Sequence, residues 1–342
     1  MVELNGKKIL VTFLMHLGDL TLTTPFIHAL RKAAPDAHIT MLVDEKLKDV
    51  VLFNPYLDEV VTIDKKGRDN SILSLWACSR HLSKLDFDVL INLHPNERCS
   101  FIDAMTSVKL RTGTTHKIFK WFWDVFTPLD RSMHAADMYL DVLQQLGVQD
   151  LSNNGLEIFP GEEHFLEAEL FWQEQNITDQ DKLIGFNIGS AVPTKRWPPE
   201  RFAEVADIFA AKGYKTVFFG GPMDEEMVAE ATGYMQTRPI TATGHFAIGG
   251  LAAAMRRCCL IITNDSGPMH VAISQKVPIV AMYGPSNPKL YGPYTKDAVI
   301  VTAQPPCQGC ADGMKHSCDD LQCMSRMTVE QVVAAAEKML EK

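Results

Sequence analysis

The clearest sign of the fold is the stretch LIITNDSGPMH, which occupies residues 260–270. Its first part, Leu260–Thr263, is a continuous apolar run, typical of a strand that is buried on both faces of a parallel sheet. Small polar residues then form a turn, and Pro268 stands near the start of the next helix, where proline is well accepted. The free N–H groups and the positive end of such a helix suit a bound anion. We therefore expect a strand, a turn and a helix, with a pyrophosphate held at the turn.

The same alternation of strands and helices runs along most of the chain. In the first half we expect strands at Lys8–Met15, His38–Val43, Val60–Ile63 and Phe87–Leu93, and helices at Leu20–Ala34, Ile72–Leu82 and His134–Leu146. In the second half we expect strands at Lys182–Ile188, Lys215–Phe219, Leu260–Thr263 and Val277–Tyr283, and helices at Pro199–Ala211, Glu225–Tyr234 and Pro268–Ser274. The stretch Pro160-Gly161-Glu162 is typical of a linker. The pattern predicts an α/β protein of two Rossmann-like, doubly wound domains, residues 1–160 and 161–342, facing each other across a central cleft.

Length and composition limit the function. The chain has 342 residues, more than one domain usually needs. Its 33 Lys and Arg against 42 Asp and Glu give a net charge of −9, which disfavours nucleic acid as a partner. No apolar run is long enough to span a membrane, and Ile9–Met15 is too short for a secretory signal. We expect a cytoplasmic protein.

The loop after the first strand reads His16-Leu17-Gly18-Asp19. Ligands of open α/β sheets bind at the carboxyl ends of the strands, so this loop is a candidate site. Gly18 would permit a tight turn. Asp19 allows two interpretations: it caps the following helix, or it is a general base that accepts a proton from a hydroxyl. The dinucleotide fingerprint GxGxxG is absent, which disfavours a nicotinamide-dependent enzyme.

Three further turns follow strands of the second half. Gly189 and Ser190 offer donors, and Lys195 is a mobile charge suited to phosphate, unless its loop is merely solvated. In the turn before the last predicted helix, Ser266 adds a hydroxyl, Gly267 permits close approach and His270 lies in the first helical turn, or else the segment is only a capped helix with a core histidine. In the turn GGPMDEE, Glu225 or Glu226 could hold ribose hydroxyls, or could simply favour the helix dipole.

Taken together, these segments resemble glycosyltransferase family nine, the ADP-heptose:lipopolysaccharide heptosyltransferases. The resemblance rests on the GD pair at residues 18–19, GSxxxxKRWP at 189–198, GGPxxEE at 220–226, NDSGPMH at 264–270, and a cysteine-rich segment that closes in Cys323-Met324. It implies the two-domain GT-B fold, with the acceptor bound by the first domain and the nucleotide sugar by the second. It also implies an inverting transfer from an ADP-sugar to the lipopolysaccharide inner core, with no tightly bound metal or cofactor.

The resemblance also implies roles for single residues. Asp19 matches the catalytic base and Lys195 the lysine near the donor phosphates. Asp265, Ser266, Gly267 and His270 match the donor-diphosphate motif, and Glu225 or Glu226 the acid near the nucleoside. In the GT-B arrangement the C-terminal helix Val329–Leu340 would cross back to the first domain. The alternatives are another GT-B enzyme, with a different donor or with epimerase activity, and a non-catalytic sugar-nucleotide sensor, which would need no base at Asp19.

Two segments keep competing interpretations. The stretch 109–131 mixes aromatic residues with cations, among them Lys109, Arg111, Lys117 and Lys120. It suits an anionic acceptor or the inner face of the inner membrane, or it covers the core of the first domain with its aromatic rings inward. The cysteines Cys307, Cys310, Cys318 and Cys323 permit a tetrahedral zinc site, or remain free thiols or a disulfide in a packed loop.

Overall fold

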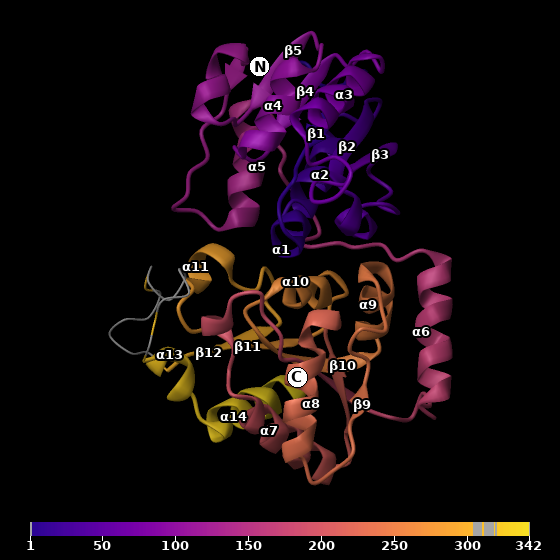
Figure 1. Ribbon diagram of the computed structural model, residues 1–342, viewed down its shortest axis with the longest axis vertical. Helices are drawn as coiled ribbons and strands as arrows, with labels where there is room; N and C mark the ends of the chain where they lie inside the picture. Colours follow the sequence, from indigo (N-terminus) through magenta and orange to yellow (C-terminus); the bar gives the residue numbers. More distant parts are fainter. Residues whose placement is uncertain (1, 304–309, 311–317, 319, 342) are drawn as a thin grey trace. The chain divides into compact units, whose positions relative to one another are not determined.

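The computed structural model describes residues 2–303, 310, 318 and 320–341. The chain divides into two compact units, Met1–Phe159 and Pro160–Lys342, which Figure 1 draws from indigo through magenta to yellow. Each unit is built on a six-stranded sheet whose neighbouring strands are all parallel. The α/β class with doubly wound sheets is therefore confirmed.

The sheet of the first unit has the order β3-β2-β1-β4-β5-β6. Its strands are β1 (Lys8–Thr12), β2 (His38–Asp44), β3 (Glu59–Ile63), β4 (Val89–Asn92), β5 (Leu110–Gly113) and β6 (Val125–Phe126). The strand β1 lies between β2 and β4, in register Leu10 to Thr40 and Leu10 to Leu90. The order reverses direction between β1 and β4, so the carboxyl ends of these two strands mark the ligand-binding crevice of this unit.

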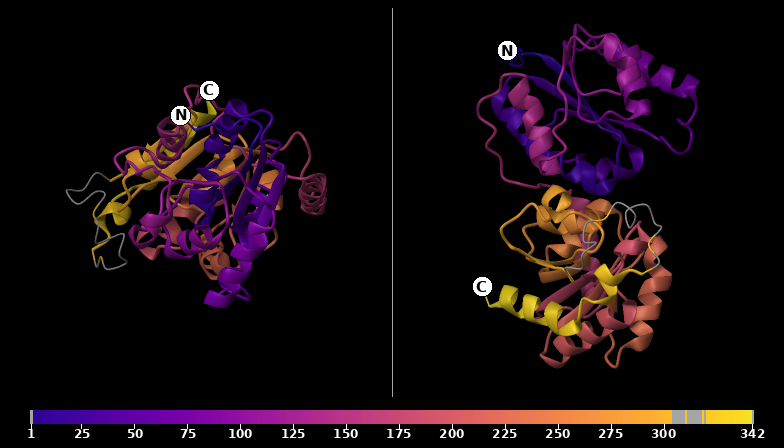
Figure 2. Two further views of the ribbon diagram at one scale, coloured as in Figure 1. Left: turned by 90° about the horizontal axis from the view of Figure 1, so that it is seen from above. Right: turned by 90° about the vertical axis from the view of Figure 1, so that its left-hand side faces the viewer.

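Helices cover both faces of this sheet (Figure 2). The helices α3 (Ile72–Ser83) and α4 (Glu97–Met105) pack on the face that carries Leu10, Leu42 and Leu90. The helices α2 (Thr24–Ala33) and α5 (Ala135–Gln145) pack against each other. The short elements α1 (Leu17–Thr21), η1 (Glu45–Val50) and η2 (Lys117–Phe122) follow the carboxyl ends of β1, β2 and β5.

The predicted single helix Leu20–Ala34 is wrong in one respect, because the structure breaks it into α1 and α2. Pro25 is the second residue of α2 and cannot lie inside a longer helix, since it lacks an N–H group and its ring clashes with the preceding turn. Thr23 stands at the break, and its hydroxyl donates to the carbonyl oxygen of Leu20 at 2.7 Å. Proline therefore sets where the second helix begins.

The sheet of the second unit has the order β12-β11-β10-β7-β8-β9. Its strands are β7 (Leu183–Asn187), β8 (Lys215–Phe219), β9 (Ile240–Thr241), β10 (Cys258–Asn264), β11 (Ile279–Met282) and β12 (Ala298–Val301). Counted along the chain, this is the strand order of the first unit again, with β7 and β10 in the places of β1 and β4. The crevice of the second unit is therefore expected where β7 and β10 end.

One face of the second sheet packs on α7 (Pro199–Ala211), α8 (Glu225–Tyr234) and α14 (Val329–Leu340). The helices α6 (Glu162–Glu174), α9 (Ile248–Met255) and α10 (Gly267–Ser274) form a second contacting group. Three short helical turns, η3 (Pro193–Lys195), η4 (Pro222–Asp224) and α11 (Pro288–Tyr291), follow the carboxyl ends of strands, and α13 (Gln322–Ser325) precedes α14. None of the described helices is both long and apolar enough to span a bilayer.

The last helix packs within the second unit. Val332 and Ala336 of α14 are fully buried in the core of the second unit, together with Trp197 and Phe202. The helix also contacts β10, β11, β12 and α7 of that unit. Its apolar face is thus occupied by the second unit, and the expected packing of this helix on the first domain stays a prediction.

Candidate functional site

The two strands at the crevice of the second unit end in asparagines that tie the following loops together. The Asn187 side-chain amide donates to the hydroxyls of Thr263 at 3.0 Å and Ser266 at 2.8 Å. The Asn264 side-chain N–H donates to the carbonyl oxygen of Ile188 at 2.7 Å. The side-chain oxygen of Asn264 accepts from the backbone N–H of Trp197 at 3.1 Å. Each loop is therefore held by the strand that precedes the other loop.

Lys195 and Asp265 form an ion pair inside this crevice. The Lys195 ammonium lies 2.7 Å from Asp265 Oδ2, and the side chains are only 14% and 6% exposed. The Ser286 hydroxyl donates to the same carboxylate oxygen, and the Ser190 hydroxyl reaches the Asp265 carbonyl oxygen at 3.4 Å. Lys195 is thus a positioned cation, and the interpretation of its loop as merely solvated is wrong.

The start of α10 completes this group. Ser266 is the N-cap residue in extended conformation, but its side chain makes no capping hydrogen bond, and its hydroxyl accepts from Asn187 instead. Pro268 occupies the first turn, and His270 behind it is 96% buried. Because the Ser266 side chain does not cap the helix, the positive end of the α10 dipole suits an anion beside Lys195.

The turn after β8 contributes carboxylates. Asp224 lies so close to Gly189 that a Cβ on that glycine would be 2.2 Å from Asp224 Oδ1. The same carboxylate accepts from the Gly221 N–H at 2.9 Å. Glu225 and Glu226 are both exposed in the first turn of α8, and Glu225 lies beside Gly244. The structure also brings Asp224 to this turn, a residue that sequence reasoning missed.

In the first unit, Asp19 is the third residue of α1 and is half-exposed. The N-cap of that helix is His16, so the interpretation of Asp19 as the capping residue is wrong. Gly18 lies inside α1 with a backbone conformation outside the left-handed region, so the expected tight turn at this glycine is also wrong. A carboxylate in the first turn of a helix is favoured in its ionised form by the helix dipole.

A pocket of about 460 Å³ opens at the carboxyl ends of this sheet. It is lined by Leu14, Met15, Lys65, Pro95, Asn96, Glu97, Arg98 and His116, which follow β1, β3, β4 and β5. Lys65 pairs with Asp44 at 3.1 Å and donates to the carbonyl oxygens of Leu14 and Met15 at 3.0 and 2.8 Å. Arg98 donates to the Lys65 carbonyl oxygen and to Asn70. The pocket thus has two cations held in place by its own walls.

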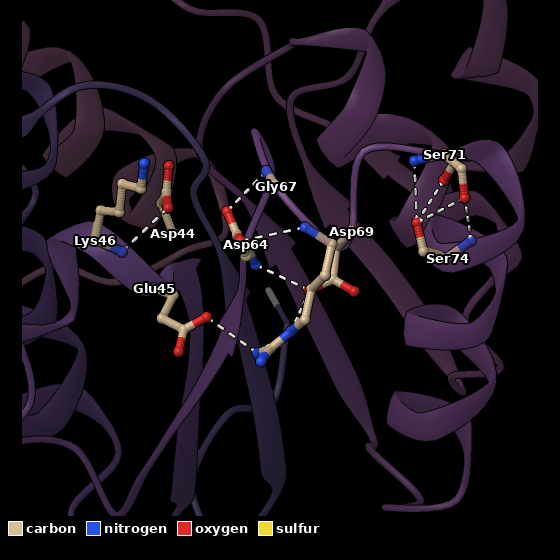
Figure 3. A network of polar contacts seen from close by, with 9 residues as sticks. Asp44, Glu45, Lys46, Asp64, Gly67, Asp69, Ser71 and Ser74 are labelled. Carbon is tan, nitrogen blue, oxygen red and sulfur yellow. Dashed lines mark hydrogen bonds and ion pairs between the residues drawn. The ribbon is translucent and has the colours of Figure 1, made fainter.

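The loop that carries Lys65 is braced by a network of carboxylates (Figure 3). Asp64 accepts from the Gly67 N–H at 2.9 Å, and Asp69 accepts from the Asp64 N–H at 3.0 Å. The Arg68 guanidinium joins Asp69 to Glu45 of η1. These bonds fix the loop between β3 and α3, and with it the position of Lys65.

His94 follows β4 and is a second residue that sequence reasoning missed. Burial, together with the electrostatic effect of Arg131 and His16, lowers its pKa to about 4. Its ring is therefore neutral at neutral pH and stands in a positively charged surrounding at the crevice of the first unit. The signal in the sequence was a histidine two residues after a buried strand.

Comparison with known proteins identifies the family of this chain. Residues 75–318 match the family described as glycosyltransferase family 9 (heptosyltransferase). The chain belongs to glycosyltransferase family 9. Its predicted membership, its enzyme class and its two Rossmann-like domains of the GT-B type are confirmed.

Three proteins illustrate the similarity of this family 9 chain. A crystal structure of a family 9 glycosyl transferase from Veillonella parvula DSM 2008 is 53% identical, with a TM-score of 0.95 over 100% of this chain and 99% of that one. Lipopolysaccharide heptosyltransferase 3 of Escherichia coli (strain K12) is 25% identical over 94% of this chain and 95% of that protein. The structure of E. coli heptosyltransferase WaaC with ADP is 17% identical, with a TM-score of 0.74 over 97% of this chain and 99% of that one, and shows a common fold.

The four predicted acceptor-binding cations of this family 9 enzyme separate into two pairs. Lys109 precedes β5 and pairs with Asp88 at 2.6 Å, at the amino end of the sheet. The Arg111 guanidinium donates to the carbonyl oxygens of Asp103 and Thr106, at the end of α4. Both have structural partners away from the pocket. Lys117 and Lys120 instead lie exposed on η2, after the carboxyl end of β5.

The cysteine cluster is described only in part. Cys307 lies outside the described residues, so the zinc site stays a prediction. Cys323 is 97% buried in the core of the second unit, with its sulfur against Gly284. Cys310 and Cys318 are half-buried, and none of the described cysteines of the cluster forms a disulfide with another.

Proposed function

We propose that this chain is an inverting heptosyltransferase that transfers heptose from ADP-heptose to the inner core of lipopolysaccharide. The proposal is supported by membership of family 9 and by relatives named as lipopolysaccharide heptosyltransferases. The observation that carries it is the Lys195–Asp265 ion pair at the end of β10, next to the uncapped start of α10. That arrangement suits a diphosphate leaving group, and a related structure holds ADP.

The donor would bind in the second unit. The Lys195 ammonium and the positive N-terminal end of α10 would hold the two phosphates, and Asp265 would keep Lys195 in place between turnovers. Negative charge grows on the diphosphate as its bond to the sugar breaks. A cation and a helix dipole fixed beforehand stabilise that charge without reorganisation, which lowers the barrier. Glu225 and Asp224, on the next turn, would meet the ribose hydroxyls.

Asp19 would be the general base. The acceptor hydroxyl oxygen forms a bond to carbon one of the heptose, the bond from that carbon to the diphosphate oxygen breaks, and ADP leaves with the electron pair. The hydroxyl proton passes to the Asp19 carboxylate. Attack on the face opposite to the leaving group inverts the configuration at carbon one, through an oxocarbenium-like state.

The acceptor would occupy the pocket of the first unit. Lys65 and Arg98 give that pocket a positive lining, which suits an anionic sugar or a phosphate on the acceptor core. The natural acceptor is attached to a lipid, so we place the enzyme in the cytoplasm, peripherally at the inner face of the inner membrane.

The deciding experiment compares Asp19→Asn with Asp137→Asn. Asp137 is also half-exposed in the first turn of a helix, α5, so its replacement removes the same helix-dipole contribution from a different place. Loss of a general base should lower kcat by about 10²–10⁴-fold in the Asp19 variant, with ADP affinity retained. The Asp137 variant should keep near-normal turnover. If both variants turn over normally and lose only the ~0.3–1 kcal/mol of a helix-dipole contact, Asp19 is not the base.

A further inference from the structure

The segment between β5 and β6 exposes a group of apolar side chains. Trp121 is 95% exposed, Ile118 60%, Phe122 45% and Phe126 36%. We call these four residues the η2 patch. Sequence analysis left open whether the aromatic rings of this segment point into the core, and for Trp121, Phe122 and Phe126 that interpretation is wrong. Most large apolar side chains of the described chain are buried, so a tryptophan this exposed needs a reason.

The η2 patch stands on a well-anchored base. Trp123 is 91% buried, and its indole N–H donates to the Thr112 carbonyl oxygen at 3.0 Å. The ring of Phe119 packs edge-on against Phe101 of α4, with 6.3 Å between the ring centres. The segment therefore alternates between rings that hold it to the unit and rings that it presents to solvent. The exposed rings thus belong to a segment that Trp123 and Phe119 anchor to the first unit.

Two lysines flank the η2 patch, with one carboxylate, that of Asp124, on the same segment. Lys117 and Lys120 are exposed, and neither forms an ion pair with any residue that the structure describes. The Lys120 ammonium lies over the Phe126 ring, 4.4 Å from its centre. The nearby carboxylate of Asp124 accepts from the Arg111 backbone N–H at 2.7 Å. In a chain of net charge −9, this is a local concentration of unpaired cations around apolar rings.

We propose that the η2 patch docks on an anionic phospholipid bilayer, with Trp121, Ile118 and Phe122 at the depth of the headgroups. Tryptophan favours this interface because its ring is apolar and its N–H stays near water. Lys117 and Lys120 would lie among the anionic headgroups, each gaining attraction from the surface potential. The biological purpose of such docking, access to a lipid-linked acceptor, rests on the proposed function, but the docking itself does not.

The composition of the η2 patch favours lipid over a protein partner. Lysine is depleted at the centres of protein–protein interfaces, where its ammonium must be desolvated. Here two unpaired lysines adjoin the rings directly, and Lys120 covers one of them. At an anionic bilayer the same ammonium groups remain hydrated while they meet negative charge, and the rings leave water.

The test measures binding of the full chain to vesicles of phosphatidylcholine alone and of phosphatidylcholine with phosphatidylglycerol, without nucleotide sugar. We expect binding to the anionic vesicles that weakens with salt. Lys117→Gln with Lys120→Gln should lower the affinity about 30-fold, since each cation contributes about fivefold. Trp121→Ser should lower it about tenfold. A blue shift of tryptophan emission on binding should disappear in Trp121→Phe, because three of the other four tryptophans are buried.

Two control variants make the same kinds of substitution at exposed positions outside the η2 patch. Lys84→Gln with Lys289→Gln removes the same charge from other exposed sites, and Met223→Ser removes an apolar side chain that is 87% exposed in the second unit. Neither should weaken vesicle binding. Equal losses in the controls, or no binding to anionic vesicles, would overturn the proposal. So would self-association without lipid that Trp121→Ser abolishes, because the patch would then join two copies of the chain. Vesicle binding by a protein that transfers no heptose would instead reject only the proposed function.

Discussion

At the scale of single residues, the crevice of the second unit depends on a charge pair that is nearly out of water. Lys195 and Asp265 neutralise each other, and Ser286 gives the carboxylate a second donor. A buried ion pair of this kind contributes little net stability while it is intact. Removing one partner is costly, because the other charge then stays buried without a counter-charge. The pair therefore couples the stability of the loops to the residue proposed to bind phosphate.

This coupling gives a prediction that separates folding from catalysis. Lys195→Ala should lower the free energy of unfolding by about 1–3 kcal/mol, because Asp265 loses its counter-charge. Adding Asp265→Asn should recover most of that loss, because the neutral amide needs no cation. Donor affinity and turnover should stay low in both variants. Urea unfolding and initial rates measure the two effects, and equal stability of the single and double variants would show that the pair does not act this way.

Asp103 in the first unit gives a pH-dependent prediction. It is fully buried beneath β1 and β4 and accepts from the Thr12 hydroxyl at 2.8 Å. Burial raises its pKa to about 7, against hydrogen bonds that lower it. Since the folded state holds this proton more tightly than the unfolded chain, the stability contributed by protonated Asp103 is complete below about pH 4 and is lost as the pH rises through about 7.

Asp103→Asn should remove this dependence, because its amide keeps the side-chain size without a titrating proton. Unfolding free energies measured from pH 4 to pH 8 should therefore shift in favour of the variant as the pH rises, and the difference should level off above about 8. Parallel curves for the two proteins across this range would contradict the raised pKa.

The residues of the two crevices could be predicted from the sequence to different degrees. Lys195, Asp265 and Ser266 were found because polar residues after a buried strand face the ligand edge of a parallel sheet. Asp224 and Asn264 were missed as site residues, since their roles come from contacts with loops far away in the sequence. The unpaired state of Lys117, against the structural pairing of Lys109, likewise depends on tertiary contacts.

At the scale of elements, the central buried strands of both sheets were predicted, whereas the helices α4, α6 and α9 were not. The helix α6 buries Ala168, Phe171 and Trp172, but it exposes Leu166 and Leu170. Because apolar residues occupy both the buried and the exposed face of this helix, the sequence shows no clear helical period. No helix was therefore predicted after the linker. The boundary of α2 was missed for a different reason, because Pro25 was given no weight as a helix start.

The turn after β7 gives an element-scale prediction. Gly189→Ala would place a methyl group 2.2 Å from Asp224 Oδ1, whose carboxylate is also held by the Gly221 N–H. The turns after β7 and β8 would have to separate, so we expect a loss of about 1–3 kcal/mol in unfolding free energy and weaker ADP binding. Gly233→Ala is the control, because a Cβ there meets nothing within 4 Å. It should be neutral or stabilising by about 0.5–1 kcal/mol, and equal behaviour of the two variants would contradict the close approach.

At the scale of the whole molecule, two sheets with one strand order provide two crevices with different chemistry. The crevice of the second unit holds a cation and an uncapped helix start, whereas that of the first holds a carboxylate, a neutral histidine and a basic pocket. The proposed reaction needs groups from both units, since the base and the leaving-group site lie on different ones. Neither unit alone could then catalyse transfer.

Hydrogen exchange of the full chain with ADP tests this division of roles. Amides in residues 188–197 and 264–270 should gain the most protection, because the phosphates would bind there. The loop 64–71, which carries Lys65, is a built-in reference for the acceptor side. Strong protection of that loop by ADP, with none at 188–197, would show that the nucleotide binds to the first unit. This result would contradict the proposed donor site.

The position of α14 has a consequence for how the protein is made. Val332 and Ala336, near the end of the chain, close a core that also contains Trp197, whose indole N–H donates to the Met327 carbonyl oxygen at 3.1 Å. During synthesis on the ribosome the first unit can finish its sheet long before this helix leaves the exit tunnel. The second unit must wait, with the apolar face of β10 and β11 open, until residues 328–340 emerge. A nascent chain stalled before Thr328 would thus present exposed apolar surface to chaperones, and the emergence of α14 becomes the vulnerable moment in its biogenesis.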